Sequence, residues 1–158
     1  MNKTELMTAV SGSARCARPG AEKEIMPSVD SWLKEAKAGE NASDAGMYLI
    51  HNGVVRGTSR ASQRETGVQD APVQGMDFSW DPARVEAARQ KALDTPGITC
   101  VRVWLNRGRL QVGDDLMLVL VGGNIRPNVI AVLEALVGEL KESCVKEKEL
   151  FCLGGSEK

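Results

Sequence analysis

The amino-acid sequence predicts an α+β domain with a mainly antiparallel sheet and two or three helices packed on it. Its 158 residues, 42% hydrophobic and 26% charged, are typical of one globular domain that can bury a core. Some segments repeat apolar residues at the three- and four-residue spacing of helices, and others alternate as strands do. Helices and strands follow one another in mixed order and are joined by turns, which indicates an α+β fold.

The first half of the chain contains one predicted helix and two predicted strands. Residues 27–39 form the helix, because proline suits a first helical turn and apolar residues then recur at helical spacing. Residues 47–56 alternate as a strand, and since both faces are largely apolar we expect it to be central in the sheet. Residues 76–80 form a short second strand.

The second half contains two predicted helices, two strands and a hairpin. Asp81-Pro82, an N-cap acid followed by proline, starts a helix that Thr95-Pro96-Gly97 stops. Residues 98–105 form a strand, and a tight turn leads to a short return strand over 110–112. Residues 115–121 are the most apolar strand. The final helix has Pro127 in its first turn and one apolar stripe of Ile130, Leu133, Val137 and Leu140, which Val129, Leu136 and Ala131 widen.

These elements belong to one predicted domain over residues 25–153. Residues 1–24 are polar and without period, so we expect a flexible N-terminal arm, and residues 154–158 form a tail. Residues 57–75 are rich in Ser, Thr, Gln, Gly and Arg, and a loop of this length is usually functional or disordered. We therefore predict a mobile loop that carries Arg60 and Arg64 next to Arg56.

Composition and charge exclude several classes of function. With 20 basic and 21 acidic residues, the chain lacks the basic field of a nucleic-acid backbone binder. No apolar run is long enough to span a membrane, and the first twenty residues do not resemble a secretory signal, so we expect a cytoplasmic protein. The single histidine and the absence of a CxxC motif argue against a zinc site, and we expect no metal and no cofactor. The cysteines are expected to be free thiols (Cys16, Cys100, Cys144 and Cys152).

Standard catalytic and phosphate-binding motifs are absent from the sequence, including the Walker loop, GxGxxG, GxSxG and HExxH. Gly122-Gly123-Asn124 lies between a strand and a helix and is either a plain turn or a site that offers backbone N–H groups to an anion. His51 could act as a base, but a lone histidine in an apolar strand is more often a satisfied core residue.

Five basic residues at or near the ends of elements are the more informative feature. Because element ends meet at sheet edges, several of them could converge on one anionic pocket, whereas each taken singly is more often a solvated charge. The seven-residue spacing of the two lysines leaves two arrangements open: about 10 Å apart on one helical face, or up to roughly 23 Å apart in an extended chain. The five residues are Arg56, Arg107, Arg126, Lys141 and Lys148.

Over residues 28–148 the sequence resembles the family of the large, catalytic subunit of molybdopterin synthase. The order and spacing of the matching segments along about 100 residues make the resemblance specific. They are Ala45-Gly46-Met47-Tyr48-Leu49-Ile50 leading to Gly53-Val54-Val55-Arg56, the hairpin VWLNRGRLQVGD over 103–114, the strand 116–121 with Asn124-Ile125-Arg126, the helix that ends in Leu140-Lys141, and Lys148 seven residues later.

The resemblance implies an α/β-hammerhead-like fold and a homodimer that binds a small ubiquitin-like sulfur carrier, giving a heterotetramer. The carrier's Gly-Gly thiocarboxylate would enter a pocket and supply sulfur to cyclic pyranopterin monophosphate, so that the chain would be a sulfurtransferase making molybdopterin. Lys141 resembles the catalytic lysine and Lys148 the second active-site lysine. Arg56 and Arg126 resemble the arginines that hold the pterin phosphate, and we group Arg107 with them as substrate-binding.

The sequence departs from the family pattern at several positions. Asn106 and Ile125 stand where the family has histidines, and residues 145–149 lack its proline and tryptophan. An alternative therefore stays open: a non-catalytic relative that binds a pterin or phosphate ligand, or a ubiquitin-like carrier tail. A third hypothesis uses the chain's own Gly154-Gly155 as a carrier tail, after removal of the last three residues.

Overall fold

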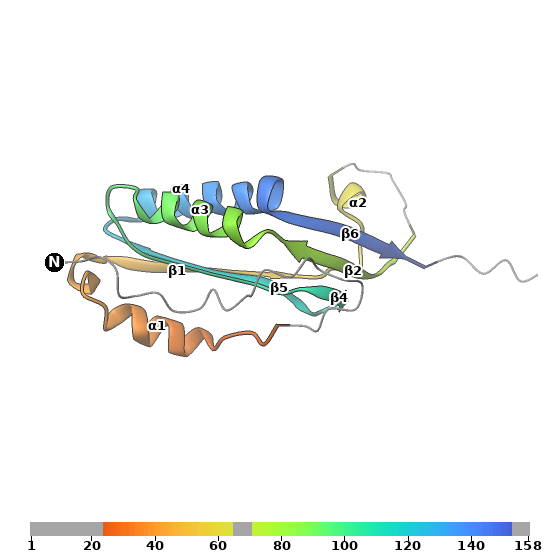
Figure 1. The fold of residues 1–158 in the computed structure, drawn as a ribbon, viewed down its shortest axis with the longest axis horizontal. Coiled ribbons are helices and arrows are strands. Elements are labelled where there is room, and N and C mark those ends of the chain that lie inside the picture. Colours follow the sequence, from red (N-terminus) through yellow and green to blue (C-terminus); the bar gives the residue numbers. More distant parts are fainter. Residues whose placement is uncertain (1–23, 65–70, 153–158) are drawn as a thin grey trace, which may run out of the picture.

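The computed structural model describes residues 24–64 and 71–152. Helices and two three-stranded antiparallel sheets form the α+β fold that the sequence predicts (Figure 1). Most of the N-terminal arm, the centre of the 57–75 loop and the Gly154-Gly155 tail lie outside the described residues. The elements are α1 (Val29–Lys37), η1 (Ala42–Asp44), β1 (Met47–Val54), α2 (Arg60–Arg64), β2 (Val73–Trp80), α3 (Pro82–Leu93), β3 (Ile98–Leu105), β4 (Gly108–Gln111), β5 (Asp115–Gly123), α4 (Arg126–Glu139), η2 (Leu140–Cys144) and β6 (Val145–Phe151).

The first sheet has the strand order β1-β5-β3, so the prediction that residues 47–56 form a central strand is wrong. β5 takes the middle, and all of its residues from Leu116 to Gly123 are buried. β1 is an edge strand on which Asn52 and Val54 are exposed. The most apolar strand is central because it is covered on both faces and paired along both edges.

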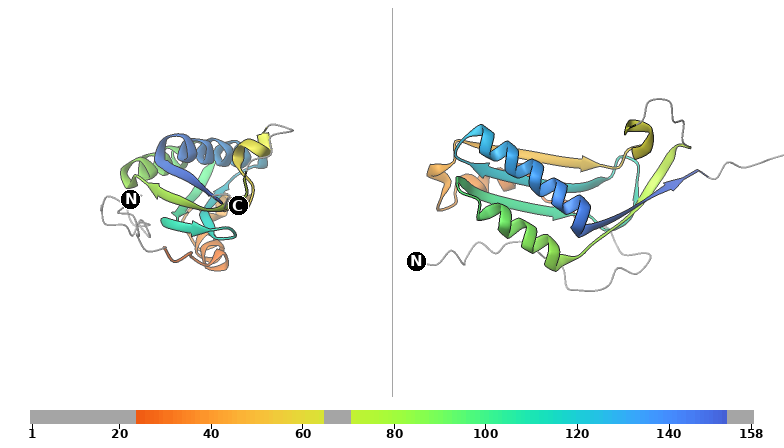
Figure 2. Two further views of the ribbon diagram at one scale, coloured as in Figure 1. Left: turned by 90° about the vertical axis from the view of Figure 1, so that its right-hand side faces the viewer. Right: turned by 90° about the horizontal axis from the view of Figure 1, so that it is seen from above.

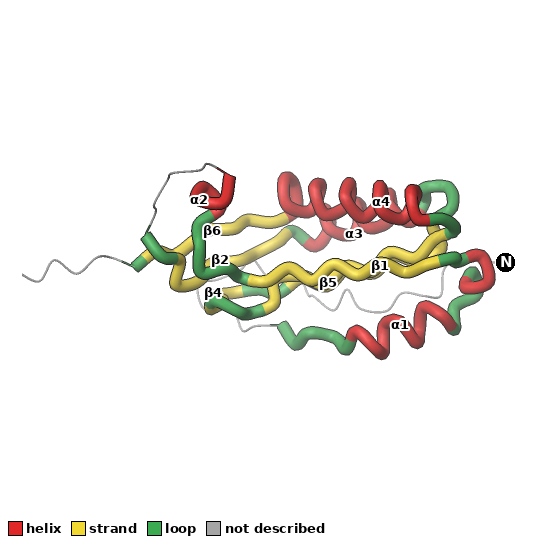
Figure 3. Tube along the Cα trace, turned by 180° about the vertical axis from the view of Figure 1, so that it is seen from behind, coloured by secondary structure: helices red, strands yellow, loops and turns green. Residues whose placement is uncertain are grey.

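Helices cover both faces of this first sheet. α3 and α4 lie side by side on one face, and α1 lies on the other (Figures 1 and 3). Alternate side chains of β5 accordingly enter two different cores. Met117 and Val119 pack with α3 and α4, whereas Leu118 and Leu120 pack with Trp32 of α1.

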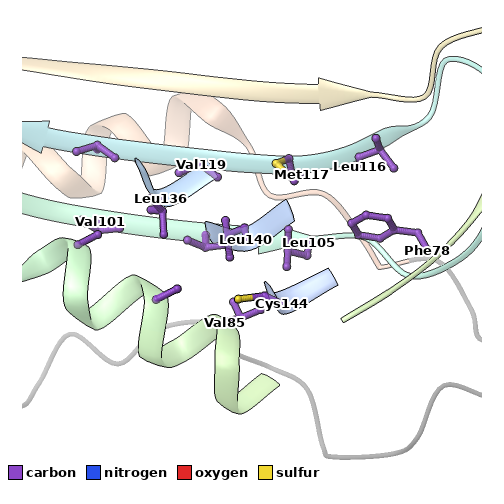
Figure 4. Close-up of a cluster of buried hydrophobic side chains, with 14 of the residues drawn as sticks. Phe78, Val85, Val101, Leu105, Leu116, Met117, Val119, Leu136, Leu140 and Cys144 are labelled. Atoms are coloured by element: carbon purple, nitrogen blue, oxygen red, sulfur yellow. The ribbon is translucent and has the colours of Figure 1, made fainter. Parts of the chain in front are cut away.

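The larger core lies between the first sheet and the helices α3 and α4 (Figure 4). Three of the apolar residues predicted for the last helix are buried, namely Val129, Leu136 and Leu140, and Val132 is buried with them. Ile130, which was predicted on the same face, is 46% exposed. The buried residues are those that face α3 and β5 together. Because apolar residues also lie on either side of this face, the sequence pattern alone does not determine which face is buried.

The second sheet has the strand order β4-β2-β6 and extends beyond the ends of α3 and α4 (Figure 2). The predicted hairpin after residue 105 does not form. β3 pairs with β5, while β4 crosses to the other sheet and pairs with β2. β6, which the sequence analysis missed, pairs along the whole of β2 and places Glu147 opposite Phe78. Its alternating lysines and glutamates have the period of a strand.

Local capping sets the ends of the helices. Asp81 caps α3 as predicted, accepting hydrogen bonds from the N–H groups of Ala83 and Arg84. α1 begins two residues after Pro27, because Ser28 is its N-cap and accepts from the Ser31 N–H. The 57–75 segment is only partly a loop, since it contains α2 and the first residues of β2.

Candidate active site

A pocket lies where the end of β1, the turn after α4, the helix α2 and the strand β6 come together. Its polar lining consists of three cations and two carboxylates, a formal net charge of +1, over an apolar wall. A weakly positive, mixed lining of this kind suits an anionic ligand that also carries hydrogen-bond donors. The lining residues are Val54, Arg56, Arg60, Met76, Leu116, Lys141, Glu147 and Glu149.

Arg56 reaches the pocket from the chain just beyond β1. The preceding residue, Val55, is buried, and its N–H donates to the Asp114 carbonyl over 2.9 Å while its own carbonyl accepts from the Gly113 N–H over 2.9 Å. This double pairing fixes the backbone next to Arg56. The Arg56 guanidinium itself forms no hydrogen bond or ion pair with any described residue.

Lys141 comes from the opposite side, on the π-helical turn η2. Leu140 is fully buried and Cys144 is 5% exposed, so both ends of this turn are held in the core (Figure 4). Single π-turns at the end of an α-helix are frequent at functional sites, because they re-aim one side chain. Within the part of the chain that the structure describes, the Lys141 ammonium has no carboxylate or other partner.

Glu147 and Glu149 enter the pocket from β6, and sequence analysis did not single them out. The Arg60 N–H donates to Glu149 Oε1 over 3.0 Å, and Arg60 Nη1 lies 3.5 Å from Glu147 Oε2. Glu147 Oε1 is buried and accepts no hydrogen bond from a described residue. The alternation of lysine and glutamate over residues 146–149 could have predicted this placement, since a period of two puts both glutamates on one face of a strand.

Lys148 lies on the opposite face of β6 from these glutamates. It is exposed and stands opposite Asp77 of β2 in the register of the sheet. The Arg109 guanidinium, bound to Asp77 over 2.8 Å, is the main cause that lowers the pKa of that carboxyl, and the charge of Lys148 adds to it. Neither of the two arrangements considered for Lys141 and Lys148 applies, because a π-turn followed by a strand separates them.

Arg107 lies outside the residues that line the pocket. Its side chain is 12% exposed, its guanidinium lies 4.5 Å from the centre of the Trp80 ring, and its Nε is 3.4 Å from Glu24 Oε1. Asn106, at one of the positions where the family has histidine, is also buried. Its side chain accepts from the Glu24 and Arg107 N–H groups and donates to the Asp115 carbonyl, so it organises this turn.

Arg126 begins α4, whereas Lys141 follows the end of that helix. Since α4 has 14 residues, about 20 Å of helix separates them in one chain. The turn before Arg126 is a plain one, because the Asn124 N–H donates to the Gly97 carbonyl and Asn124 Oδ1 accepts from the Ile125 N–H over 2.7 Å. Of the five predicted site residues, the structure therefore brings together Arg56 and Lys141.

His51 is not the satisfied core residue that its place in the strand predicted. It is half-buried on β1, and its Nε2 is buried without a hydrogen-bond partner among residues 24–64 and 71–152. Burial lowers the pKa of His51, and the positive charge of Lys141 lowers it further. The imidazole is therefore neutral at pH 7 and close enough to Lys141 to sense its charge.

In residues 24–64 and 71–152, no group of three His, Cys, Asp or Glu side chains is placed to hold a metal ion. None of the helices in those residues has the length and apolar character needed to cross a membrane. The site is thus an α+β scaffold that presents an unpaired arginine and lysine in one pocket, as anion-binding proteins do.

Comparison with known proteins places the chain in a family. The model of the family described as MoaE protein matches residues 27–143. A molybdopterin synthase structure from Staphylococcus aureus has a TM-score of 0.62 at 17% identity, covering 82% of this chain and 90% of that one. A molybdopterin biosynthesis MoaE protein from Burkholderia ambifaria MC40-6 has a TM-score of 0.57 at 19% identity, covering 78% and 82%.

A third solved structure is a protein–protein complex of subunits 1 and 2 of the molybdopterin-converting factor from Helicobacter pylori 26695. It matches with a TM-score of 0.55 at 19% identity and covers 82% of this chain and 84% of that one. The comparison with curated proteins finds no match. The chain belongs to the MoaE family, which confirms the resemblance found in the sequence, and the family and fold support the role of a molybdopterin synthase large subunit.

Proposed function

We propose that this chain catalyses the sulfur-transfer step of molybdopterin synthesis, with Arg56 and Lys141 as the groups that contact the reactants. The observation that carries the proposal is the meeting of these two side chains, unpaired by any described residue, in one pocket. Lys141 is half-buried and Arg56 is exposed, and both cations are available to an anion because no internal partner competes.

The chemistry of the substrates fits this pair of side chains. The Arg56 guanidinium can donate two parallel hydrogen bonds to the phosphate of cyclic pyranopterin monophosphate. Lys141 can neutralise the thiocarboxylate of the carrier and the charge that develops as sulfur bonds to the pterin. Two such transfers are needed for the two sulfurs of molybdopterin. In each, the carrier's carbon–sulfur bond breaks and water supplies the oxygen of the released carboxylate, while at the pterin side chain a carbon–sulfur bond forms and a carbon–oxygen bond breaks, its oxygen leaving on the phosphate or as water.

A small-subunit partner is the second part of the proposal. The Helicobacter pylori match is a complex of subunits 1 and 2 of the converting factor, which supports a two-subunit assembly for this chain. We propose a homodimer that binds one ubiquitin-like carrier per chain, and place the reaction in the cytoplasm. Arg126 and Lys148 lie outside the single-chain pocket, so a contribution from them would come from another surface or another copy.

The test is a reconstituted reaction. The purified chain is mixed with a thiocarboxylated carrier and cyclic pyranopterin monophosphate, and molybdopterin is measured through its fluorescent oxidation product. We expect Lys141→Ala to abolish product, Arg56→Ala to weaken substrate binding, and the control Lys146→Ala, on the exposed face of β6, to leave turnover unchanged. Unchanged turnover in Lys141→Ala would remove the mechanism. Calorimetric pterin binding without product from the native chain would instead establish a non-catalytic relative.

A further inference from the structure

Glu147 carries a feature that binding a phosphate and a thiocarboxylate does not explain. It is an acidic side chain on the inner face of the second sheet, opposite Phe78, which is 2% exposed. Its own side chain is 15% exposed. An acid at such a position costs free energy unless it is paired and hydrogen-bonded.

Arg60 pairs with only one of the two carboxylate oxygens of Glu147. Its Nη1 lies 3.5 Å from Glu147 Oε2, a distance of an ion pair rather than of a close hydrogen bond. The other oxygen, Oε1, is buried and has no donor among the described residues. Glu149, two residues along the same strand, is different because its Oε1 accepts from the Arg60 N–H. Glu147 therefore offers a vacant acceptor in a pocket that also contains two unpaired cations, Arg56 and Lys141.

We infer that Glu147 is a specificity-determining residue that accepts a hydrogen bond from the last peptide N–H of the carrier tail, while Lys141 and Arg56 face the tail's terminal anion. This inference rests on the proposed function. The pocket requires a ligand whose anionic group and N–H donor lie close together, because the unpaired cations and the vacant acceptor line the same small hollow.

The end of a polypeptide has that arrangement. The terminal carboxylate or thiocarboxylate and the amide N–H of the same glycine are separated by one carbon atom. A cyclic phosphate diester carries no hydrogen-bond donor and would be repelled by Glu147. The acid thus favours the tail over an anion without donors.

The test changes the ligand by one atom. A semisynthetic carrier whose final glycine is replaced by glycolic acid has an ester oxygen in place of the last N–H and keeps the terminal carboxylate. Binding of both carriers to the full chain is measured by calorimetry. We expect the native chain to bind the amide carrier about tenfold more tightly, as a hydrogen bond to a charged group provides. The preference should vanish in Glu147→Leu, persist in part in Glu147→Gln, and stay intact in Glu142→Gln, an exposed control.

Equal binding of the two carriers by the native chain would overturn the inference and leave the proposed function standing. A Glu147→Leu chain with an unchanged preference but weakened binding of cyclic pyranopterin monophosphate would also overturn it, because the acceptor would then serve the pterin. Binding of neither carrier would overturn the proposed partner together with the inference. Because the native chain decides the first comparison, a variant that fails to fold does not remove the test.

Discussion

The imidazole of His51 and the ammonium of Lys141 are electrostatically coupled across the edge of the first sheet. Burial is the larger cause that lowers the pKa of His51, and the positive charge of Lys141 is the second. This coupling links the chain's single histidine to the lysine that we place at the reacting groups.

A histidine titration provides the first prediction. Because the chain has one histidine, its NMR signal reports one group, and we expect a midpoint below the ordinary 6.5. Lys141→Met should move the midpoint part of the way back towards 6.5, since it removes one of the two causes. Lys146→Met, the control, should leave it in place. An unmoved midpoint in Lys141→Met would show that the two groups do not interact.

The same shift makes stability depend on pH. The unfolded chain binds the His51 proton more readily than the folded one, so the free energy of unfolding should fall as pH decreases through about 6.5 and level off below the folded pKa. His51→Gln should lack this component of the pH profile. Urea unfolding between pH 5 and 8 measures both proteins, and parallel profiles would contradict the assignment.

Arg107 is expected to act on stability rather than on catalysis. Arg107→Ala removes a stacking contact with Trp80 and leaves Glu24 and the ring without their cation, at a cost of about 1–3 kcal/mol. Arg109→Ala, two residues along, loses a solvent-exposed pair with Asp77 and should change the unfolding midpoint little. Normal stability with lost substrate binding in Arg107→Ala would return this residue to the substrate-binding role predicted from the sequence.

Two glycines should respond in opposite directions to alanine. Gly97 has φ +87°, and an added Cβ would lie 2.7 Å from the Asn124 side chain, so Gly97→Ala should cost about 1–3 kcal/mol. Gly138 lies inside α4 with open space around its Cβ position. Gly138→Ala should therefore stabilise the fold by about 0.5–1 kcal/mol. Thermal unfolding of both variants checks the pair, and a stabilising Gly97→Ala would refute the backbone argument.

Lys148 and Arg126 should differ from Lys141 in the sulfur-transfer assay. Because neither lines the single-chain pocket, Lys148→Ala and Arg126→Ala should retain turnover unless a second copy of the chain completes the site. If Arg126→Ala alone is inactive, mixing it with inactive Lys141→Ala should restore part of the activity through mixed dimers. Inactive mixtures would show that both residues are needed within one chain.

The local sequence determined most of the secondary structure. Asp81 and the proline after it start α3, residues 98–105 form β3 with the predicted bounds, and the continuous apolar run of β5 marks a strand covered on both faces. These features follow from capping and from the periods of helix and strand, which depend on neighbours within a few residues. The family could also be recognised from the sequence, because the order and spacing of its motifs are kept although individual motif residues are replaced.

Only the tertiary structure decided which elements meet. A period-2 pattern does not say which strand will be the partner, so β1 was expected at the centre and β4 beside β3. The pocket joins Arg56 to residues about 90 positions away, Glu147 and Glu149, whose inward direction depends on the pairing of β6 with β2. The motif around Arg107 predicts a substrate-binding residue, and only the packed chain shows that its guanidinium lies over the Trp80 ring and near Glu24. Burial and charge pairing are properties of the packed chain, and local sequence does not specify them.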